Sequence, residues 1–131
     1  MELVHTCYRV NDLARSLSFY GALGLREVVR LPLPEDAGFM VFLGDEGDKP
    51  RLELCFEPGT GPHEPGTGYY HVGIAVHDLD AVLAELATQG IEPMMEPFAP
   101  VEPPPGQSPT RITFLRDPDG YQVELLENYP F

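Results

Sequence analysis

Hydrophobic and polar residues alternate along the chain in patterns that predict a strand followed by a helix. In the segment 71–76, HVGIAV, every second residue from Val72 is a branched apolar one, so one face of the predicted strand is apolar. A helix is predicted next, because leucine and valine recur at spacings of three and four residues from Leu79 to Leu86. Asp78 stands at its N-cap and Gly90 just past its end.

The same pattern of a strand followed by a capped helix occurs earlier in the chain, at 5–25. There Asp12 is the expected N-cap, Leu13, Leu17 and Tyr20 make the apolar stripe, and Gly24 ends the helix. A shift of 66 residues aligns the two segments without a gap. It then superposes six identical residues: His5 on His71, Val10 on Val76, Asp12 on Asp78, Leu13 on Leu79, Leu17 on Leu83, and Gly24 on Gly90. The chain is therefore an internal repeat.

Three further strands are expected after each helix. They lie at about 25–31, 39–44 and 51–57 in the first half, and at 92–96, 111–116 and 121–127 in the second. The sequence DPDG at 117–120 predicts a hairpin between the last two. Each half is thus a βαβββ module of an α+β protein. We expect a single domain over 1–131, with module 1 at about 1–57, a Pro/Gly-rich linker at 58–68 and module 2 at about 69–131.

Composition narrows the classes of function. The 21 acidic residues outnumber the 8 basic ones and give a net charge of −13, which disfavours binding to nucleic acids or to anionic membranes. No apolar run is long enough to span a bilayer, and the first ten residues, MELVHTCYRV, lack the pattern of a signal peptide. A cytoplasmic location is therefore expected. The two cysteines, Cys7 and Cys55, form no disulfide framework.

Four polar residues stand at equivalent places of the two modules. His5 and His71 begin the first strands, and Glu53 and Glu124 lie in the last strands between apolar neighbours that should pack under the helices. Each of the four should therefore point away from the helices. Two imidazoles and two carboxylates converging about a pseudo-twofold axis would form a divalent metal site with two nitrogen and two oxygen ligands.

The chain resembles the glyoxalase I family (lactoylglutathione lyases) of the vicinal oxygen chelate superfamily, in its short bacterial form. The resemblance covers nearly the whole chain. It is carried by HTCYRVNDLARSLSFYGALGL from His5, LEL at 52–54, GYYHVGIAV at 68–76 and, most specifically, DPDGYQVELLE at 117–127. It implies paired βαβββ modules that form a cupped, eight-stranded mixed sheet around a metal, with the helices outside. It also implies that the four metal ligands are His5, Glu53, His71 and Glu124.

The resemblance implies isomerisation of the hemithioacetal of methylglyoxal and a thiol to a 2-hydroxyacyl thioester, through an enediolate chelated by the metal. Glu124 would be the catalytic base, and Glu53 a ligand and second acid or base. The short form implies nickel or cobalt, although the ligand types would also accept zinc or manganese. The resemblance further implies substrate binding by Arg9, and a homodimer whose active sites are shared between chains.

Two features depart from the family pattern. The family places an asparagine four residues after the first metal-binding glutamate, where this chain has Glu57, and a basic residue in the loop that here is EPFAPVEPPPGQSP, at 96–109. Both departures disfavour a thiol with two carboxylates, such as glutathione. Three alternatives therefore stay open: another isomerase, epimerase or lyase of the superfamily acting on a different thiol or acid, an extradiol dioxygenase, and a non-catalytic small-molecule binder.

Overall fold

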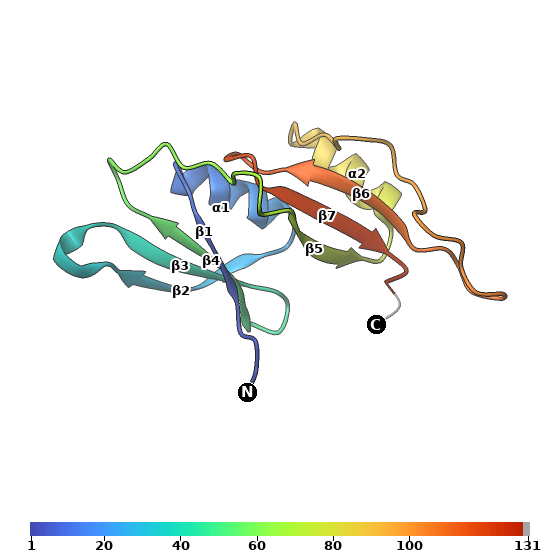
Figure 1. Ribbon diagram of the computed structural model, residues 1–131, viewed down its shortest axis with the longest axis horizontal. Coiled ribbons are helices and arrows are strands. Elements are labelled where there is room, and N and C mark those ends of the chain that lie inside the picture. The colour runs from blue at the N-terminus through green and yellow to red at the C-terminus, as the bar shows by residue number, and fades with distance from the viewer. Residues whose placement is uncertain (130–131) are drawn as a thin grey trace. The chain divides into compact units, whose positions relative to one another are not determined.

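The computed structural model describes residues 1–129 and divides the chain into two compact units. Unit 1 is Met1–Glu64, and unit 2 begins at Pro65, so their boundary lies within the segment 58–68 that we expected to be a linker. The final two residues of the predicted module 2, 130 and 131, lie outside the described part of the chain. Each unit is α+β, with one sheet and one α-helix (Figure 1).

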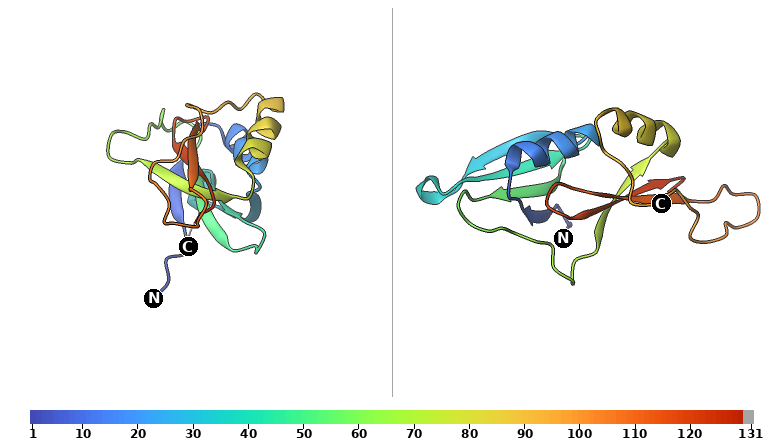
Figure 2. Two further views of the ribbon diagram at one scale, coloured as in Figure 1. Left: turned by 90° about the vertical axis from the view of Figure 1, so that its right-hand side faces the viewer. Right: turned by 90° about the horizontal axis from the view of Figure 1, so that it is seen from above.

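Unit 1 has the predicted βαβββ order. Its elements are β1 (Thr6–Arg9), α1 (Leu13–Ala22), β2 (Arg26–Pro32), a 3₁₀ turn (Pro34–Asp36), β3 (Phe39–Gly44) and β4 (Pro50–Phe56). The sheet order is β1-β4-β3-β2, in which β1 and β4 run parallel and the other neighbours antiparallel. Figure 2 shows α1 lying across one face of this sheet.

Unit 2 repeats this order with one strand fewer. Its elements are β5 (His71–Val76), α2 (Leu79–Thr88), β6 (Arg111–Arg116) and β7 (Gln122–Glu127), and the sheet order is β5-β7-β6. The pairing of β5 with β7 is parallel, as is that of β1 with β4, and β6 and β7 form an antiparallel hairpin. The turn of that hairpin is the predicted one, since Asp117 accepts hydrogen bonds from the amides of Asp119 and Tyr121.

The predicted strand at 92–96 is wrong, so the described residues form seven strands in two sheets and not a sheet of eight. The segment does run beside β6, where the amide of Met94 donates to the Phe114 carbonyl and Phe98 forms an isolated bridge with Ile112. Pro93 and Pro97 interrupt it, and a proline has no N–H to donate to a strand ladder. Regular pairing therefore fails here, although the apolar residues match a strand.

Both helices begin and end as their sequences predict. The Asp12 carboxylate accepts a hydrogen bond from the amide of Arg15, and that of Asp78 accepts one from the amide of Ala81. After the helices, Gly24 and Gly90 adopt φ values of 83° and 75°, which glycine tolerates without strain. Among residues 1–129, no helix is both long and apolar enough to cross a lipid bilayer.

The core of each unit lies between its helix and one face of its sheet. In unit 1 the residues buried there are Tyr8, Val10, Leu13, Phe19, Tyr20, Val41, Leu43, Leu52 and Leu54; in unit 2 they include Leu79, Leu86, Leu115, Val123 and Leu125. Leu52 and Leu54 flank Glu53 in β4, and Val123 and Leu125 flank Glu124 in β7. Because side chains alternate along a strand, both glutamates point to the face opposite the helix.

Candidate functional site

The opposite face of the unit 1 sheet brings His5 and Glu53 together. His5 immediately precedes β1, and β1 pairs with β4 in a register that places Cys7 beside Glu53. The Nε2 atom of His5 lies 2.9 Å from Oε2 of Glu53, and the two side chains are 30% and 12% exposed. The imidazole and the carboxylate therefore form a half-buried pair that remains accessible from one side.

Unit 2 builds the same pair from equivalent positions. The Nε2 atom of His71 lies 3.1 Å from Oε2 of Glu124, with side-chain exposures of 28% and 14%. Gly73 pairs with Glu124 in the register between β5 and β7, as Cys7 does with Glu53 in unit 1. Two segments with only partial sequence identity thus place a histidine and a glutamate in nearly the same geometry. The structure brings the four predicted site residues together as two pairs, one in each unit.

An aromatic ring orients the histidine in each pair. Phe42 of β3 stands opposite Glu53, with its ring 5.3 Å from that of His5 and nearly perpendicular to it. Phe114 of β6 stands opposite Glu124, with its ring 5.4 Å from that of His71. Neither phenylalanine is among the site residues that the sequence pattern predicts. The signal was the dipeptide Phe-Leu, present in the third strand of unit 1 and again in β6.

Packing has a particular role at His71. Its Nδ1 atom is buried and has no hydrogen-bond partner among residues 1–129, so no second hydrogen bond fixes the ring. Instead Tyr70 and Phe114 contact it, with ring centroids 4.6 Å and 5.4 Å away, and these two rings stack on each other. The orientation of this imidazole is therefore set by the aromatic contacts together with the contact between Nε2 and Glu124.

The donor set suits a divalent metal ion. In an octahedral site with bonds of about 2.1 Å, neighbouring ligand atoms lie about 3.0 Å apart. The separations of 2.9 Å and 3.1 Å within the two His–Glu pairs match that spacing. Each pair also presents one nitrogen and one oxygen, a combination that nickel, cobalt, zinc and manganese accept. Over residues 1–129, no three or more His, Cys, Asp or Glu side chains cluster as a metal site, so each unit contributes one pair of candidate ligands.

The two cysteines of the chain flank the His–Glu pair of unit 1. Cys7 lies beside Glu53, and Cys55 is two residues further along β4 on the same face. Burial, followed by the negative charge of Glu53, raises the pKa of the Cys7 thiol to about 12. Burial and the charge of Glu57 also raise the pKa of Cys55. Both thiols are therefore protonated at neutral pH in the metal-free protein.

Arg9, the predicted substrate-binding residue, is held by an acidic neighbour. It ends β1 on the same face as His5, and its Nη1 atom lies 2.5 Å from Oε2 of Glu57. The Arg9 side chain is 58% exposed and that of Glu57 is 27% exposed. The residue that departs from the expected asparagine is thus the ion-pair partner of the arginine expected to meet the substrate.

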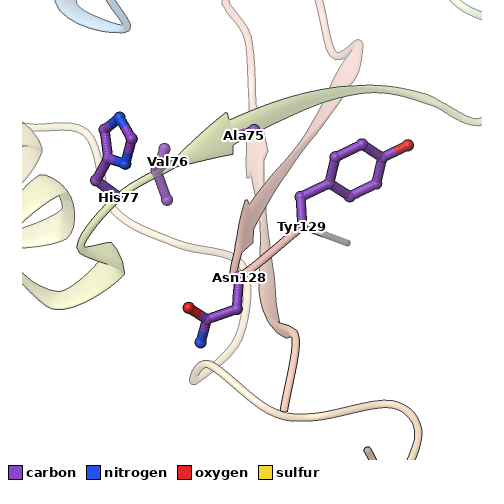
Figure 3. A pocket seen from close by; sticks show the side chains of 5 residues that line it. All are labelled: Ala75, Val76, His77, Asn128 and Tyr129. Atoms are coloured by element: carbon purple, nitrogen blue, oxygen red, sulfur yellow. The ribbon is translucent and has the colours of Figure 1, made fainter. Parts of the chain in front are cut away.

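Unit 2 has a pocket at the equivalent place. The shift that aligns His5 with His71 aligns Arg9 with Ala75, and the shift that aligns Glu53 with Glu124 aligns Glu57 with Asn128. A pocket of about 260 Å³ opens there, lined by Ala75, Val76, His77, Asn128 and Tyr129 (Figure 3). Asn128 adopts a φ of 55° and donates from Nδ2 to the Pro109 carbonyl. The positions that hold the charged Arg9 and Glu57 in unit 1 therefore hold a methyl group and an amide in unit 2.

Comparison with known proteins identifies relatives along nearly the whole chain. Residues 2–125 match the model of the Glyoxalase/Bleomycin resistance protein/Dioxygenase superfamily. The chain is 37% identical to the lactoylglutathione lyase of Haemophilus influenzae over 131 residues, which covers 98% of this chain and 93% of that one.

Two solved structures of glyoxalase I have a similar fold. The enzyme from Zea mays has a TM-score of 0.79 and 32% identity over 95% of this chain, which spans only 44% of the maize protein. The trypanothione-dependent enzyme from Leishmania major has a TM-score of 0.76 and 31% identity, and the match covers 97% of this chain and 86% of that one.

Proposed function

The chain belongs to the Glyoxalase/Bleomycin resistance protein/Dioxygenase superfamily, and we propose that it is a lyase of the glyoxalase I type. It isomerises the hemithioacetal of a 2-oxoaldehyde, such as methylglyoxal, and a thiol to the 2-hydroxyacyl thioester. The observation that carries this proposal is the His–Glu pair found twice with matching geometry. It occurs in a chain whose bacterial relatives at 32–37% identity are named lactoylglutathione lyases.

We propose that His5, Glu53, His71 and Glu124 together hold one divalent ion, with nickel or cobalt preferred over zinc or manganese. The fit of both pairs to neighbouring positions of an octahedron supports this, since four protein ligands would leave two positions for substrate oxygens. When bound, such an ion supplies electrostatic stabilisation of the negative charge that develops on those oxygens as the carbon-bound proton leaves.

The chain's own contribution is proton transfer. The reaction moves the proton of the carbon bearing sulfur to the neighbouring carbonyl carbon, and the hydroxyl proton to the other oxygen, so no oxidant or leaving group is needed. Glu124 is the proposed base that takes the carbon-bound proton and returns it to the next carbon, and Glu53 is the second acid or base. Both carboxylates are mostly buried, with side chains 12% and 14% exposed, and each keeps one side open to the substrate.

We further propose a homodimer in which each active site takes one pair from each chain. His5 and Glu53 of one copy would meet His71 and Glu124 of the partner subunit, and the twofold axis would make two equal sites. Because each unit carries one complete His–Glu pair, either two copies or the two units of one chain could supply both pairs, and the family resemblance favours exchange between copies.

The decisive experiment loads the metal-stripped protein with nickel or cobalt and follows thioester formation from methylglyoxal and a panel of thiols that includes glutathione. We expect activity that a chelator removes and that the metal restores. The variants His5→Ala and His71→Ala should each lose at least about 100-fold in metal affinity and nearly all turnover, following the usual cost of losing a ligand.

The matched control is His63→Ala, because His63 contacts Thr60 in a loop outside both pairs. It should bind one metal ion per chain, as measured by elemental analysis, and turn over like the wild type. Metal-loaded protein that forms no thioester with any thiol of the panel would refute the proposed function, as would full activity in His71→Ala.

A further inference from the structure

We infer that Glu57 determines which thiol the enzyme accepts. Glu57 forms an ion pair with Arg9 and so makes the part of the thiol site furthest from the His5–Glu53 pair acidic. That part would select a thiol whose group there is neutral or cationic. This inference rests on the proposed function and adds to it the chemical class of the thiol. Three observations support it: the position of the Arg9–Glu57 pair, its small contribution to stability, and the uncharged residues at the equivalent positions of unit 2.

The position of Arg9 suits contact with the thiol and not with the reacting carbons. His5, Cys7 and Arg9 share one face of the strand, because alternate residues point the same way. Four residues of strand separate His5 from Arg9, a distance of about 13 Å. A substrate whose reacting carbons lie at His5 and Glu53 would need a peptide-sized thiol to reach Arg9. Arg9 would therefore contact the groups of the thiol that lie furthest from its sulfur atom.

The Arg9–Glu57 ion pair is not required by the fold. Arg9 is exposed and Glu57 is only partly buried, and ion pairs that water can reach contribute little to stability. The equivalent positions of unit 2 hold Ala75 and Asn128, and that unit forms the same strand pairing and the same His–Glu pair without a charge at either place. A structural role thus gives no reason for Glu57 at this position, whereas a role in recognition does.

The charges of Arg9 and Glu57 determine which thiols are favoured. A carboxylate of the thiol that approaches Arg9 must compete with the carboxylate of Glu57, which is tethered by the chain and already in contact. Two charges of the same sign would then share one guanidinium in a protein of net charge −13. An amide or an ammonium group meets no such repulsion and can bind to Glu57 directly. The substrate class is therefore a thiol without a carboxylate at this end.

The test measures binding and not turnover. S-hexylglutathione carries two carboxylates, its diethyl ester carries none, and neither can react. Calorimetric titration of nickel-loaded protein gives the ratio of their dissociation constants. For the wild type we expect the diester to bind more tightly. In Glu57→Gln the ratio should shift about tenfold towards S-hexylglutathione, as expected when one like-charge contact is removed. Adding Arg9→Gln to that variant should abolish the shift.

The matched control is Glu27→Gln. Glu27 forms a similar exposed pair with Arg30, with Nη2 2.6 Å from Oε2, on β2 at the opposite edge of the same sheet. This variant changes the net charge equally and should leave the ratio within about twofold of the wild type.

The inference is overturned if Glu57→Gln shifts the ratio by less than about threefold, if Glu27→Gln shifts it as much, or if no variant binds either thioether. The proposed function is judged separately. Thioester formation from methylglyoxal with any thiol of the panel keeps that function intact even when the ratio fails to shift, and its absence with every thiol refutes the function.

Discussion

The ring of Phe114 stands edge-on to the imidazole of His71, with centroids 5.4 Å apart and an interplanar angle of 69°. Since Nδ1 of this histidine has no hydrogen-bond partner among residues 1–129, its rotamer is restricted by the rings of Phe114 and Tyr70 and by the contact of Nε2 with Glu124. Phe42 makes the equivalent edge-on contact with His5 in unit 1. A ligand that is held in one orientation before the metal arrives loses less freedom on binding.

Phe114→Leu should therefore weaken nickel binding by about threefold to tenfold, because leucine keeps much of the apolar volume but lets the imidazole sample other rotamers. Calorimetric titration of the metal-stripped protein measures this change. Phe98→Leu is the matched control, since Phe98 is 42% exposed and its described backbone pairing is a single bridge. Equal nickel affinities in Phe114→Leu and the wild type would show that the ring does not orient His71.

Glu124→Gln should retain most of its metal affinity and lose turnover by about 10²–10⁴-fold, because an amide oxygen still binds metal but cannot accept the carbon-bound proton. The measurements are metal content and the initial rate of thioester formation. Glu92→Gln, an exposed change of the same type in unit 2, should leave both unchanged. More than about a tenth of wild-type turnover in Glu124→Gln would exclude this residue as the essential base.

Mixing inactive variants tests the shared site. If two chains build each site, His5→Ala and Glu124→Gln unfolded and refolded together should form mixed dimers in which one site carries both lesions and the other carries none. With random pairing, half of the dimers are mixed and half of their sites are intact, so about a quarter of wild-type activity should return. Mixed dimers that show no more activity than either parent would mean that each site belongs to a single chain.

The Cys7 thiol should react slowly with alkylating agents. Its pKa of about 12 leaves far less thiolate at pH 8 than an ordinary cysteine has, so iodoacetamide should modify it roughly 10³-fold more slowly. Because the thiolate is the reactive form, the rate should rise about tenfold per pH unit up to pH 11 without a plateau. Cys55→Ser isolates Cys7 for this mass-spectrometric measurement. A plateau below pH 9 would contradict the raised pKa.

Local sequence predicted the helices and most strands, because their determinants are close together in the chain. Asp12 and Asp78 begin helices within three residues of the amides that they bind, and β3, β6 and β7 lie within a residue of their expected bounds. The strand predicted at 92–96 failed because apolar alternation does not reveal which amides a ladder needs. Proline removed the required donors in that segment.

The site was predictable only in part, for a related reason. The repeat predicted the four histidine and glutamate residues as candidate ligands because they recur in sequence, and the structure places them in two matching pairs. The contacts of Phe42 with His5 and of Arg9 with Glu57 join residues 37 and 48 positions apart, and they depend on strand register and on side-chain rotamers. Nothing in the spacing of single residues encodes that register, so a phenylalanine opposite one of these glutamates cannot be told from a core residue in the sequence.

The raised pKa values of Cys7 and Cys55, beside the His5–Glu53 pair, affect how the enzyme withstands its reactive substrate. A 2-oxoaldehyde is an electrophile, and a protein that concentrates it exposes its own nucleophiles to covalent damage. Burial and the neighbouring carboxylates keep Cys7 and Cys55 protonated, and the protonated form is the unreactive one. Burial, together with the neighbouring carboxylates, thus slows the reaction of these two thiols with the electrophilic substrate.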